Sequence, residues 1–314
     1  MIDAMPEPGR PLRIGTRGSP LALAQAHETR DRLMAAHGLP EAAFEIVVIR
    51  TTGDRVLDRP LSEIGGKGLF TREIEEALIE GAIDVAVHSM KDMPTLQPEG
   101  LVIDCLLPRE DVRDAFVSLG AARGLGDLPA GARVGTSSLR RRAQLRRRRP
   151  DLEVVEFRGN VQTRMRKLGD GVAAATFLAM AGLRRLGMEA VATAPIPPEA
   201  MLPAVAQGCV GVERRAADER AAALLAPIHD AATGLRVAAE RAFLAGLDGS
   251  CQTPIAGLAE LDGDRLRLRG EILRPDGSEA LAEALDGLAA DGPAMGAAAA
   301  AALRGRAGPG FFDG

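Results

Sequence analysis

The sequence predicts an α/β protein with two α/β domains followed by a small α+β domain. Short apolar runs alternate with amphipathic segments through residues 12–186, which is typical of parallel sheets with crossover helices. Three runs of alternating polarity follow after residue 255 and predict an antiparallel three-stranded sheet. The 314 residues also exceed the length of one typical domain. We assign residues 1–110 with 208–227 to a first domain, 111–207 to a second and 228–314 to a third.

The first domain shows strand and helix signals in turn. Ser19 suits the N-cap of a helix, and Pro20 suits its first position. Residues 54–68 contain Pro and Gly but little periodicity, so we expect a loop there. Expected strands cover residues 12–16, 44–51, 101–107 and a run that begins at 83, and expected helices cover 21–36 and 70–80.

The second domain repeats this style. The stretch Thr136-Ser137-Ser138 is expected to cap one helix, and the Gly159-Asn160 turn precedes a second. Residues 194–203 contain four prolines and are interpreted as a linker, whereas 210–213 form a strand that could return to the first sheet. Expected strands cover residues 114–119, 133–135, 152–157 and 172–178. In the third domain we expect helices over 230–246 and 294–304 and strands over 255–261, 264–273 and 278–285.

The most informative stretch is residues 83–94. Its first half is β-branched and apolar, and its second half is polar and ends at Pro94. His88, Ser89, Lys91 and Asp92 are therefore expected at the carboxyl end of a strand, where open α/β sheets bind ligands.

Charge is distributed unevenly along the chain. The net charge is −4, yet residues 133–167 contain 12 Arg or Lys and three acidic residues, which leaves the remainder at −13. Arg140 and Arg141 follow a short strand and open a helix, and Arg158 and Arg164 repeat this arrangement one element later. Such a pattern predicts a local site for carboxylates or phosphates. An RNA site is disfavoured, because no aromatic residues are interleaved to stack bases.

The three cysteines predict one reactive thiol. Cys105 and Cys209 lie in apolar runs, whereas Cys251 lies in a glycine-flanked polar loop. There is no CxxC pair and the four histidines are scattered, so we expect no metal site. No apolar run approaches the length of a membrane span, and residues 1–11 carry no apolar signal core, so we expect a cytoplasmic protein.

Eight short motifs occur in one order along residues 12–257. They are TRGSPLA (16–22), GGKGLF (65–70), AVHSMKD (86–92), GTSSLRR (135–141), RGNV (158–161), AGL (181–183), LPA with QG (202–204 and 207–208) and GSCQ (249–252). In these motifs the chain closely resembles the porphobilinogen deaminase family. The resemblance implies two domains like the halves of a type II periplasmic binding protein, with the active site between them, and a third domain with a cysteine-bearing loop.

The implied reaction joins four porphobilinogen molecules head to tail with loss of ammonia and releases hydroxymethylbilane. By resemblance, Cys251 holds a dipyrromethane cofactor through a thioether, and Asp92 is the catalytic carboxylate that contacts pyrrole N–H groups. Further cofactor contacts are implied for Lys67, Ser89, Lys91, Ser138, Arg140 and Arg141. Substrate contacts are implied for Arg17, Ser19, Gln25, Arg158, Arg164 and Arg185. Glu63 stands where some members carry a lysine, so no role is carried over to it, and His88 is left off the catalytic residues.

A non-catalytic relative of the periplasmic anion receptors is the alternative from a different functional class. It would need the arginines but neither Asp92 nor Cys251. The partner we expect is porphobilinogen, with neither nucleic acid nor membrane, and we expect a monomer because nothing indicates an extensive apolar interface.

Overall fold

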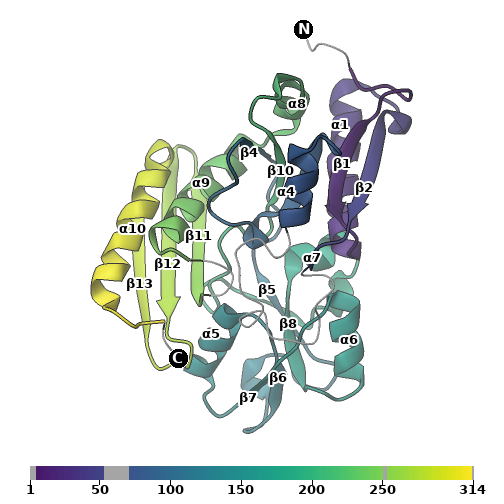
Figure 1. Ribbon diagram of the computed structural model, residues 1–314. Helices are drawn as coiled ribbons and strands as arrows, with labels where there is room; N and C mark the ends of the chain where they lie inside the picture. Colours follow the sequence, from purple (N-terminus) through teal and green to yellow (C-terminus); the bar gives the residue numbers. More distant parts are fainter. Residues whose placement is uncertain (1–4, 53–70, 250–252, 313–314) are drawn as a thin grey trace. The chain divides into compact units, whose positions relative to one another are not determined.

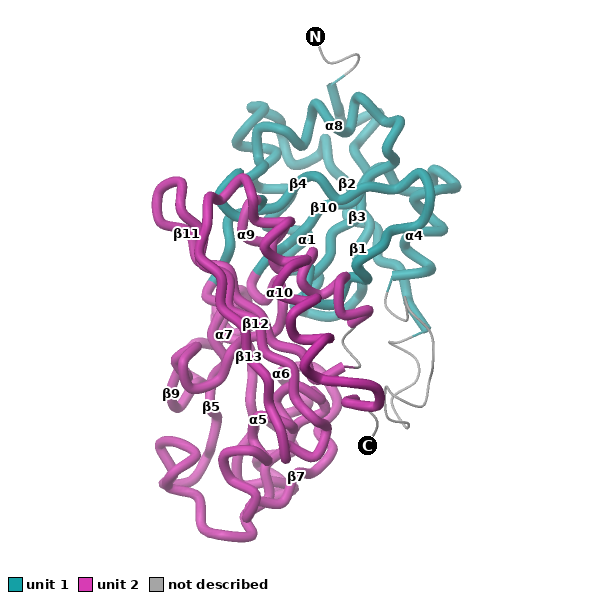
Figure 2. Tube along the Cα trace, turned by 90° about the vertical axis from the view of Figure 1, so that its left-hand side faces the viewer, with its two compact units in different colours: residues 1–56, 66–110, 209–234 teal, residues 57–65, 111–208, 235–314 magenta. Residues whose placement is uncertain are grey.

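The computed structural model describes residues 5–52, 71–249 and 253–312 (Figure 1). The chain divides into two compact units (Figure 2). Of the described residues, unit 1 contains 5–52, 71–110 and 209–234, and unit 2 contains 111–208, 235–249 and 253–312. The predicted division into three domains stays a prediction, and the loop expected over residues 54–68 lies outside the described residues.

Unit 1 is built on a mixed five-stranded sheet in the order β2-β1-β3-β10-β4. β1 pairs in parallel with both β2 and β3, and β10 runs antiparallel between β3 and β4. The strand that was expected to return to the first sheet is therefore confirmed. The strands are β1 (Leu12–Arg17), β2 (Phe44–Ile49), β3 (Val85–Ser89), β4 (Leu101–Leu106) and β10 (Val210–Arg215).

Helices cover both faces of this sheet. α1 (Pro20–His37) begins as predicted, because the Ser19 side chain accepts a hydrogen bond from the Ala22 amide. Its side of the sheet buries Leu12, Val85 and Val87, and α4 (Arg72–Ile79) packs over Ala86 on the other side. The sequence analysis missed α8 (Glu219–Leu225), which Asp218 caps by accepting from the Ala221 amide at 2.9 Å.

The first sheet of unit 2 has the order β7-β6-β8-β5-β9. Its strands are β5 (Asp114–Val117), β6 (Arg133–Gly135), β7 (Glu153–Val155), β8 (Ala175–Ala179) and β9 (Ala194–Ile196), and its helices are α5 (Leu139–Arg148), α6 (Val161–Gly169) and α7 (Met180–Arg185). The linker interpretation of residues 194–203 was wrong at its start, because β9 pairs antiparallel with β5. β9 is an edge strand. Proline has no backbone N–H group, and an edge strand tolerates Pro195 because only one of its sides is paired.

The two five-stranded sheets repeat one pattern. Each has three parallel strands, then an antiparallel strand, then a fifth strand antiparallel to the fourth. The fourth strand of each sheet comes directly after the chain changes from one unit to the other. β5 follows the change at residue 111, and β10 follows the change at residue 209. This confirms the α/β fold class and the prediction of two similar halves.

The C-terminal part of unit 2 is the predicted antiparallel sheet, in the order β11-β12-β13. α10 lies along this sheet, and α9 lies beside α10 (Figure 1). Its elements are α9 (Ala231–Gly246), β11 (Ile255–Asp262), β12 (Arg265–Leu273), β13 (Ala280–Leu288) and α10 (Gly292–Ala307). Short 3-10 turns are η1 (Glu41–Ala43), η2 (Met90–Asp92), η3 (Leu125–Asp127), η4 (Glu189–Val191), η5 (Ala226–Ile228) and η6 (Ala289–Asp291).

Candidate active site

Unit 1 contains a pocket of about 70 Å³ at the carboxyl ends of β1 and β3. The pocket forms here because β1 ends at Arg17 beside the capped start of α1, while β3 turns into η2 after Ser89. Five residues that the resemblance selected line it, namely Arg17, Ser19, Gln25, Ser89 and Asp92. Leu21, Ala22, Thr71, Val87, His88 and Met93 complete the lining. The fold therefore brings these five residues together in one pocket at this edge of the sheet.

Gln25 and Ser89 fix one wall of this pocket. The buried Gln25 amide donates from Nε2 to Ser89 Oγ at 2.7 Å. The Ser89 hydroxyl in turn donates to Gln25 Oε1 at 3.1 Å. This pair ties α1 to the end of β3. The Ser89 hydroxyl is thus held in place before any ligand arrives.

Asp92 lies at the end of η2 and is exposed. Its neighbours Met90 and Met93 are buried, and the Met90 amide donates to the Cys209 carbonyl at 3.0 Å, which anchors the turn. Among the residues that the structure describes, the Asp92 carboxylate has neither a hydrogen bond nor an ion pair. It is therefore free to meet a positive charge or an N–H group of a ligand.

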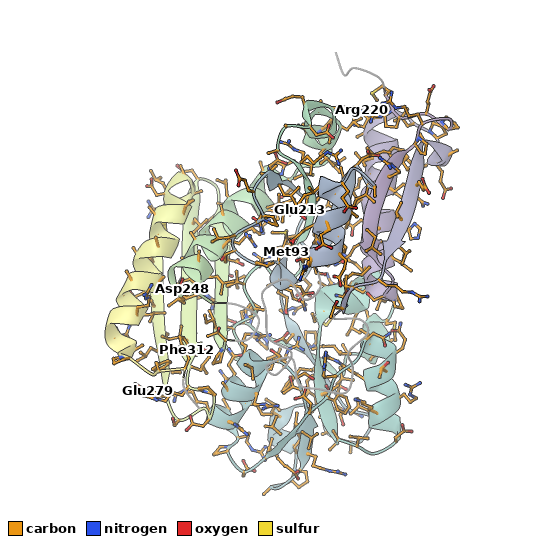
Figure 3. All side chains as sticks on the ribbon, in the orientation of Figure 1. Met93, Glu213, Arg220, Asp248, Glu279 and Phe312 are labelled. Carbon is orange, nitrogen blue, oxygen red and sulfur yellow. The ribbon has the colours of Figure 1, made fainter. Side chains whose placement is uncertain are left out.

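A buried charge cluster lies behind the pocket, and the sequence analysis missed it. His88 Nε2 lies 3.0 Å from Glu213 Oε2, and the two side chains are only 5% and 0% exposed. Glu213 lies on the central strand β10 (labelled in Figure 3), and Glu75 approaches from α4. Burial raises the pKa of Glu75, and the nearby Glu213 carboxylate adds to this effect. The one available signal was a glutamate inside the apolar run 210–213.

Unit 2 places the predicted arginine residues around a second buried carboxylate. Arg140 donates from its NH2 group to Asp114 Oδ2 at 2.8 Å, and Arg141 donates from NH2 to Oδ1 at 2.6 Å. Gln207 Nε2 also donates to Asp114 Oδ1. Burial alone would raise the pKa of Asp114, but the two guanidinium groups outweigh it and hold that pKa well below its usual range.

This arrangement changes the picture of Arg140 and Arg141. Their terminal nitrogens are occupied by Asp114 and by three further acceptors, Gln144 Oε1 and the carbonyls of Leu202 and Phe177. The Nε–H group of each is buried and has no partner among the described residues. Sequence reasoning overlooked Asp114 because it lies 26 residues from Arg140 and only the fold brings them together.

The other predicted residues of unit 2 follow three of its parallel strands along the chain. Ser138, Arg158, Arg164 and Arg185 follow the carboxyl ends of β6, β7 and β8, and all four are half-exposed. Ser138 caps α5, and Asn160 caps α6 by accepting from the Thr163 amide. Helix N-termini and guanidinium groups together favour anions at these strand ends. Lys67 and Cys251 lie outside the described residues.

Two general features complete the description. No described helix has both the length and the apolar character needed to cross a membrane. Within the described ranges, no three His, Cys, Asp or Glu side chains are grouped so that they could hold a metal ion.

Sequence comparison covers nearly the whole chain. Residues 12–223 match the family described as porphobilinogen deaminase, dipyromethane cofactor binding domain, and residues 234–304 match the porphobilinogen deaminase C-terminal domain. A porphobilinogen deaminase of Paracoccus denitrificans is 75% identical over 312 residues, which is 99% of each chain.

Two of the solved structures that the chain resembles are distant in sequence. A YaeC-family lipoprotein of Enterococcus faecalis is 16% identical over 70% of this chain and 91% of its own, with a TM-score of 0.41. The periplasmic VFT2 domain of Bordetella pertussis BvgS (double mutant F375E/Q461E) is 15% identical over 69% and 84%, with a TM-score of 0.38. These values carry no argument about function, whereas the sequence matches do: the chain belongs to the porphobilinogen deaminase family.

Proposed function

We propose that this protein is a hydroxymethylbilane synthase, which polymerises four porphobilinogen molecules head to tail with release of ammonia. Its product would be the linear hydroxymethylbilane of tetrapyrrole biosynthesis. The observation that carries the proposal is the match of residues 12–223 and 234–304 to the two family domains. The pocket in which Arg17, Ser19 and Asp92 converge agrees with it. A non-catalytic anion receptor would need no such acid in its pocket.

The residues of unit 2 fit a dipyrromethane cofactor. That group carries several carboxylates, and it would meet the half-exposed residues Arg158, Arg164 and Arg185, which follow β7 and β8 along the chain. The buried Nε–H groups of Arg140 and Arg141 lack acceptors among the described residues, and a carboxylate oxygen could supply one. When bound through Cys251, the cofactor supplies the free pyrrole carbon to which the first substrate is joined.

The side chains divide the remaining work. Asp92 accepts hydrogen bonds from pyrrole N–H groups and stabilises positive charge that develops on the rings. Guanidinium groups hold the acetate and propionate groups of the substrate, because their planar forks match a carboxylate in a bidentate manner. We assign the substrate carboxylates to Arg17, Arg158, Arg164 and Arg185 with Ser19 and Gln25, and further cofactor contacts to Lys67, Ser89, Lys91 and Ser138.

Intact-protein mass spectrometry tests the cofactor. Active protein should be heavier than its sequence by one dipyrromethane, and Cys251→Ser should lack this increment. An unmodified mass in active protein would contradict the proposal.

Asp92→Ala tests the catalytic carboxylate. We expect this variant to fold and to carry the cofactor, while turnover falls by about a thousandfold because charge stabilisation in the pocket is lost. Asp31→Ala is the matched control, since Asp31 is 61% exposed and pairs only with Arg30 on the outside of α1. Near-normal turnover of Asp92→Ala would refute the role given to Asp92.

We further propose a cytoplasmic monomer. The exposed large apolar side chains of the described residues are spread over different elements, for example Val48, Ile79, Leu96 and Leu288. Scattered apolar residues of this kind do not make an interface. Sedimentation equilibrium should give a mass near 33 kDa, against 32.9 kDa for one chain.

A further inference from the structure

His88 occupies a special position on β3. Side chains alternate along a strand, so His88 shares the α4-facing side with Ala86, which packs against α4. Its neighbour Ser89 faces α1 and bonds Gln25. At the end of the strand both residues line the pocket that contains Asp92. His88 therefore connects the buried interior beneath α4 to the pocket.

The hydrogen bonding of His88 leaves one ring nitrogen for the pocket. Nε2 is engaged by Glu213 at 3.0 Å, and among the described residues no partner is found for Nδ1. A carboxylate that accepts from one nitrogen of an imidazole fixes the tautomer and makes the other nitrogen a proton acceptor. His88 is one of the residues that line the pocket, and because Nε2 is engaged by Glu213, Nδ1 is the ring nitrogen left for a pocket occupant.

We propose that His88 and Glu213 form a carboxylate–imidazole dyad whose Nδ1 atom moves protons in the substrate pocket. This inference rests on the proposed function, because it takes that pocket as the place where porphobilinogen reacts. Glu213 would act through His88 as a positioning residue. Asp92 would keep its own task of stabilising positive charge.

The reaction needs such a group. Each condensation breaks the C–N bond of one aminomethyl group, forms a C–C bond and breaks the C–H bond of the free α-carbon of the other pyrrole. The C–H electron pair restores the aromatic ring, and its proton must go to a base. The aminomethyl group enters as an ammonium and leaves as ammonia when the C–N bond breaks. After the C–C bond has formed, Nδ1 accepts the C–H proton and passes it to the ammonia still in the pocket, which is released as ammonium. No net proton is gained or lost in one cycle, so the dyad returns to its starting state.

Several ionisable side chains surround His88. Glu213 faces it from β10 and Glu75 from α4, while Arg17 and Asp92 share the pocket. Lys91 follows it in η2. Burial raises the pKa of Glu75, and Glu213 is the carboxyl group that directly contacts the imidazole. A buried carboxylate then stabilises the imidazolium whenever Nδ1 takes up a proton.

His88→Gln is the central variant. The glutamine amide can donate to Glu213 in place of Nε2, which keeps the buried carboxylate satisfied, but it cannot take up a proton. We expect cofactor attachment and KM to persist while kcat falls about 100-fold. The control is His37→Gln, because His37 also uses Nε2, as a bond to the Leu224 carbonyl at 2.8 Å, and lies outside the pocket.

Two kinetic measurements distinguish proton transfer by His88 from a purely structural role. With porphobilinogen deuterated at its free α-carbon, His88→Gln should show a larger primary isotope effect than wild type, because removal of this proton becomes slow. Its pH–kcat profile should also lose one inflection. A wild-type kcat, or an unchanged isotope effect and pH profile, would overturn the proposal.

NMR of the protein without substrate gives a readout independent of turnover. The chain has only four histidines, so the ring signals missing from His88→Gln identify His88. We expect the Nε2–H tautomer near neutral pH, and in Glu213→Gln a mixture of tautomers with kcat lowered at least tenfold. If His88→Gln fails to fold, Glu213→Gln decides: unchanged tautomer and turnover would refute the dyad. If wild-type protein instead lacks the dipyrromethane mass increment, the proposed function fails, whatever the state of His88.

Discussion

Asp114 is completely buried and nevertheless ionised, because Arg140, Arg141 and Gln207 all donate to its two oxygens. This carboxylate joins β5 to the start of α5 and to the segment before β10. It therefore holds in place the helix start at which Ser138 lies, together with the Nε–H groups of Arg140 and Arg141, which have no partner within the described part of the chain. Substrate-binding arginines can be effective only if such a framework fixes their position.

Asp114→Asn should therefore destabilise the protein strongly. An amide cannot neutralise two buried guanidinium groups, and breaking a buried pair by removing one partner lowers the free energy of unfolding by about 3 kcal/mol or more. The control is Asp151→Asn, because Asp151 is 39% exposed and its partner Arg149 also donates to two backbone carbonyls, so only a small effect is expected. Urea denaturation measures both, and equal shifts would contradict the importance of burial.

The same carboxylate predicts a dependence of stability on pH. Its pKa in the folded protein lies below the unfolded value of about 3.9, so its stabilisation is complete above that pH and is lost as the pH falls towards the folded value. Urea midpoints of wild type should fall below about pH 4, and Asp114→Asn should show a shallower decline there. Identical slopes for both proteins would rule Asp114 out as the source.

At the scale of single residues, the sequence predicted where Arg17, Ser19, Gln25, Ser89 and Asp92 would gather. Ser89 and Asp92 were found from the end of an apolar strand, whereas Arg17, Ser19 and Gln25 were selected by the family resemblance. Glu213 and Asp114 were missed, because a buried acidic residue is recognised only by its partners. Those partners lie far away along the chain.

At the scale of elements, the contact between α9 and α10 depends on small residues. A Cβ atom on Gly296 would lie 2.3 Å from the Ala239 carbonyl oxygen and 2.8 Å from the Phe243 amide nitrogen, both backbone atoms. The two helices therefore approach each other closely at this point. No local sequence pattern specifies how close two helices must come.

Gly296→Ala should consequently destabilise the protein, although alanine favours helices. The matched substitution in the same helix is Gly305→Ala, where a Cβ would meet nothing within 4 Å. That variant should be more stable than wild type by up to about 1 kcal/mol, from helix propensity alone. Thermal denaturation of the two variants should move the midpoint in opposite directions, and a shift in the same direction would refute the close contact.

Most elements agree with the sequence expectation because their signals are local. Apolar periodicity located the strands and helices of the third domain, and Ser19 and Ser138 were identified as helix caps. β9 was not predicted, because residues 194–203 contain four prolines and a proline-rich stretch of this kind indicates a linker. It becomes a strand only because β5 offers a free edge beside it.

At the scale of the whole molecule, the reactivity of the cysteine thiols depends on whether the protein is folded. Cys105 and Cys209 are buried, and burial raises the pKa of Cys105 to about 12. At pH 8 roughly one Cys105 side chain in ten thousand is then a thiolate, the form that reacts with disulfide reagents. The folded protein should therefore protect Cys105 from such reagents.

Counting the thiols of denatured protein tests the cofactor linkage. Denatured protein that carries the cofactor should react at two thiols, because the third cysteine, Cys251, is expected as a thioether. The denatured Cys251→Ser variant should give the same two, and protein freed of cofactor should give three. Three reactive thiols in cofactor-loaded protein would contradict attachment at Cys251.

The sequence by itself determined the α/β class, the order of nearly all elements, the side chains at the strand ends and the resemblance to porphobilinogen deaminases. These properties follow from local periodicity, caps and short motifs. Only the tertiary structure decided that Arg140 and Arg141 share one buried carboxylate and that His88 is paired with Glu213 behind the pocket. Each of these pairings joins residues far apart in sequence, and a buried charge is stable only where the fold brings its partner within hydrogen-bonding distance.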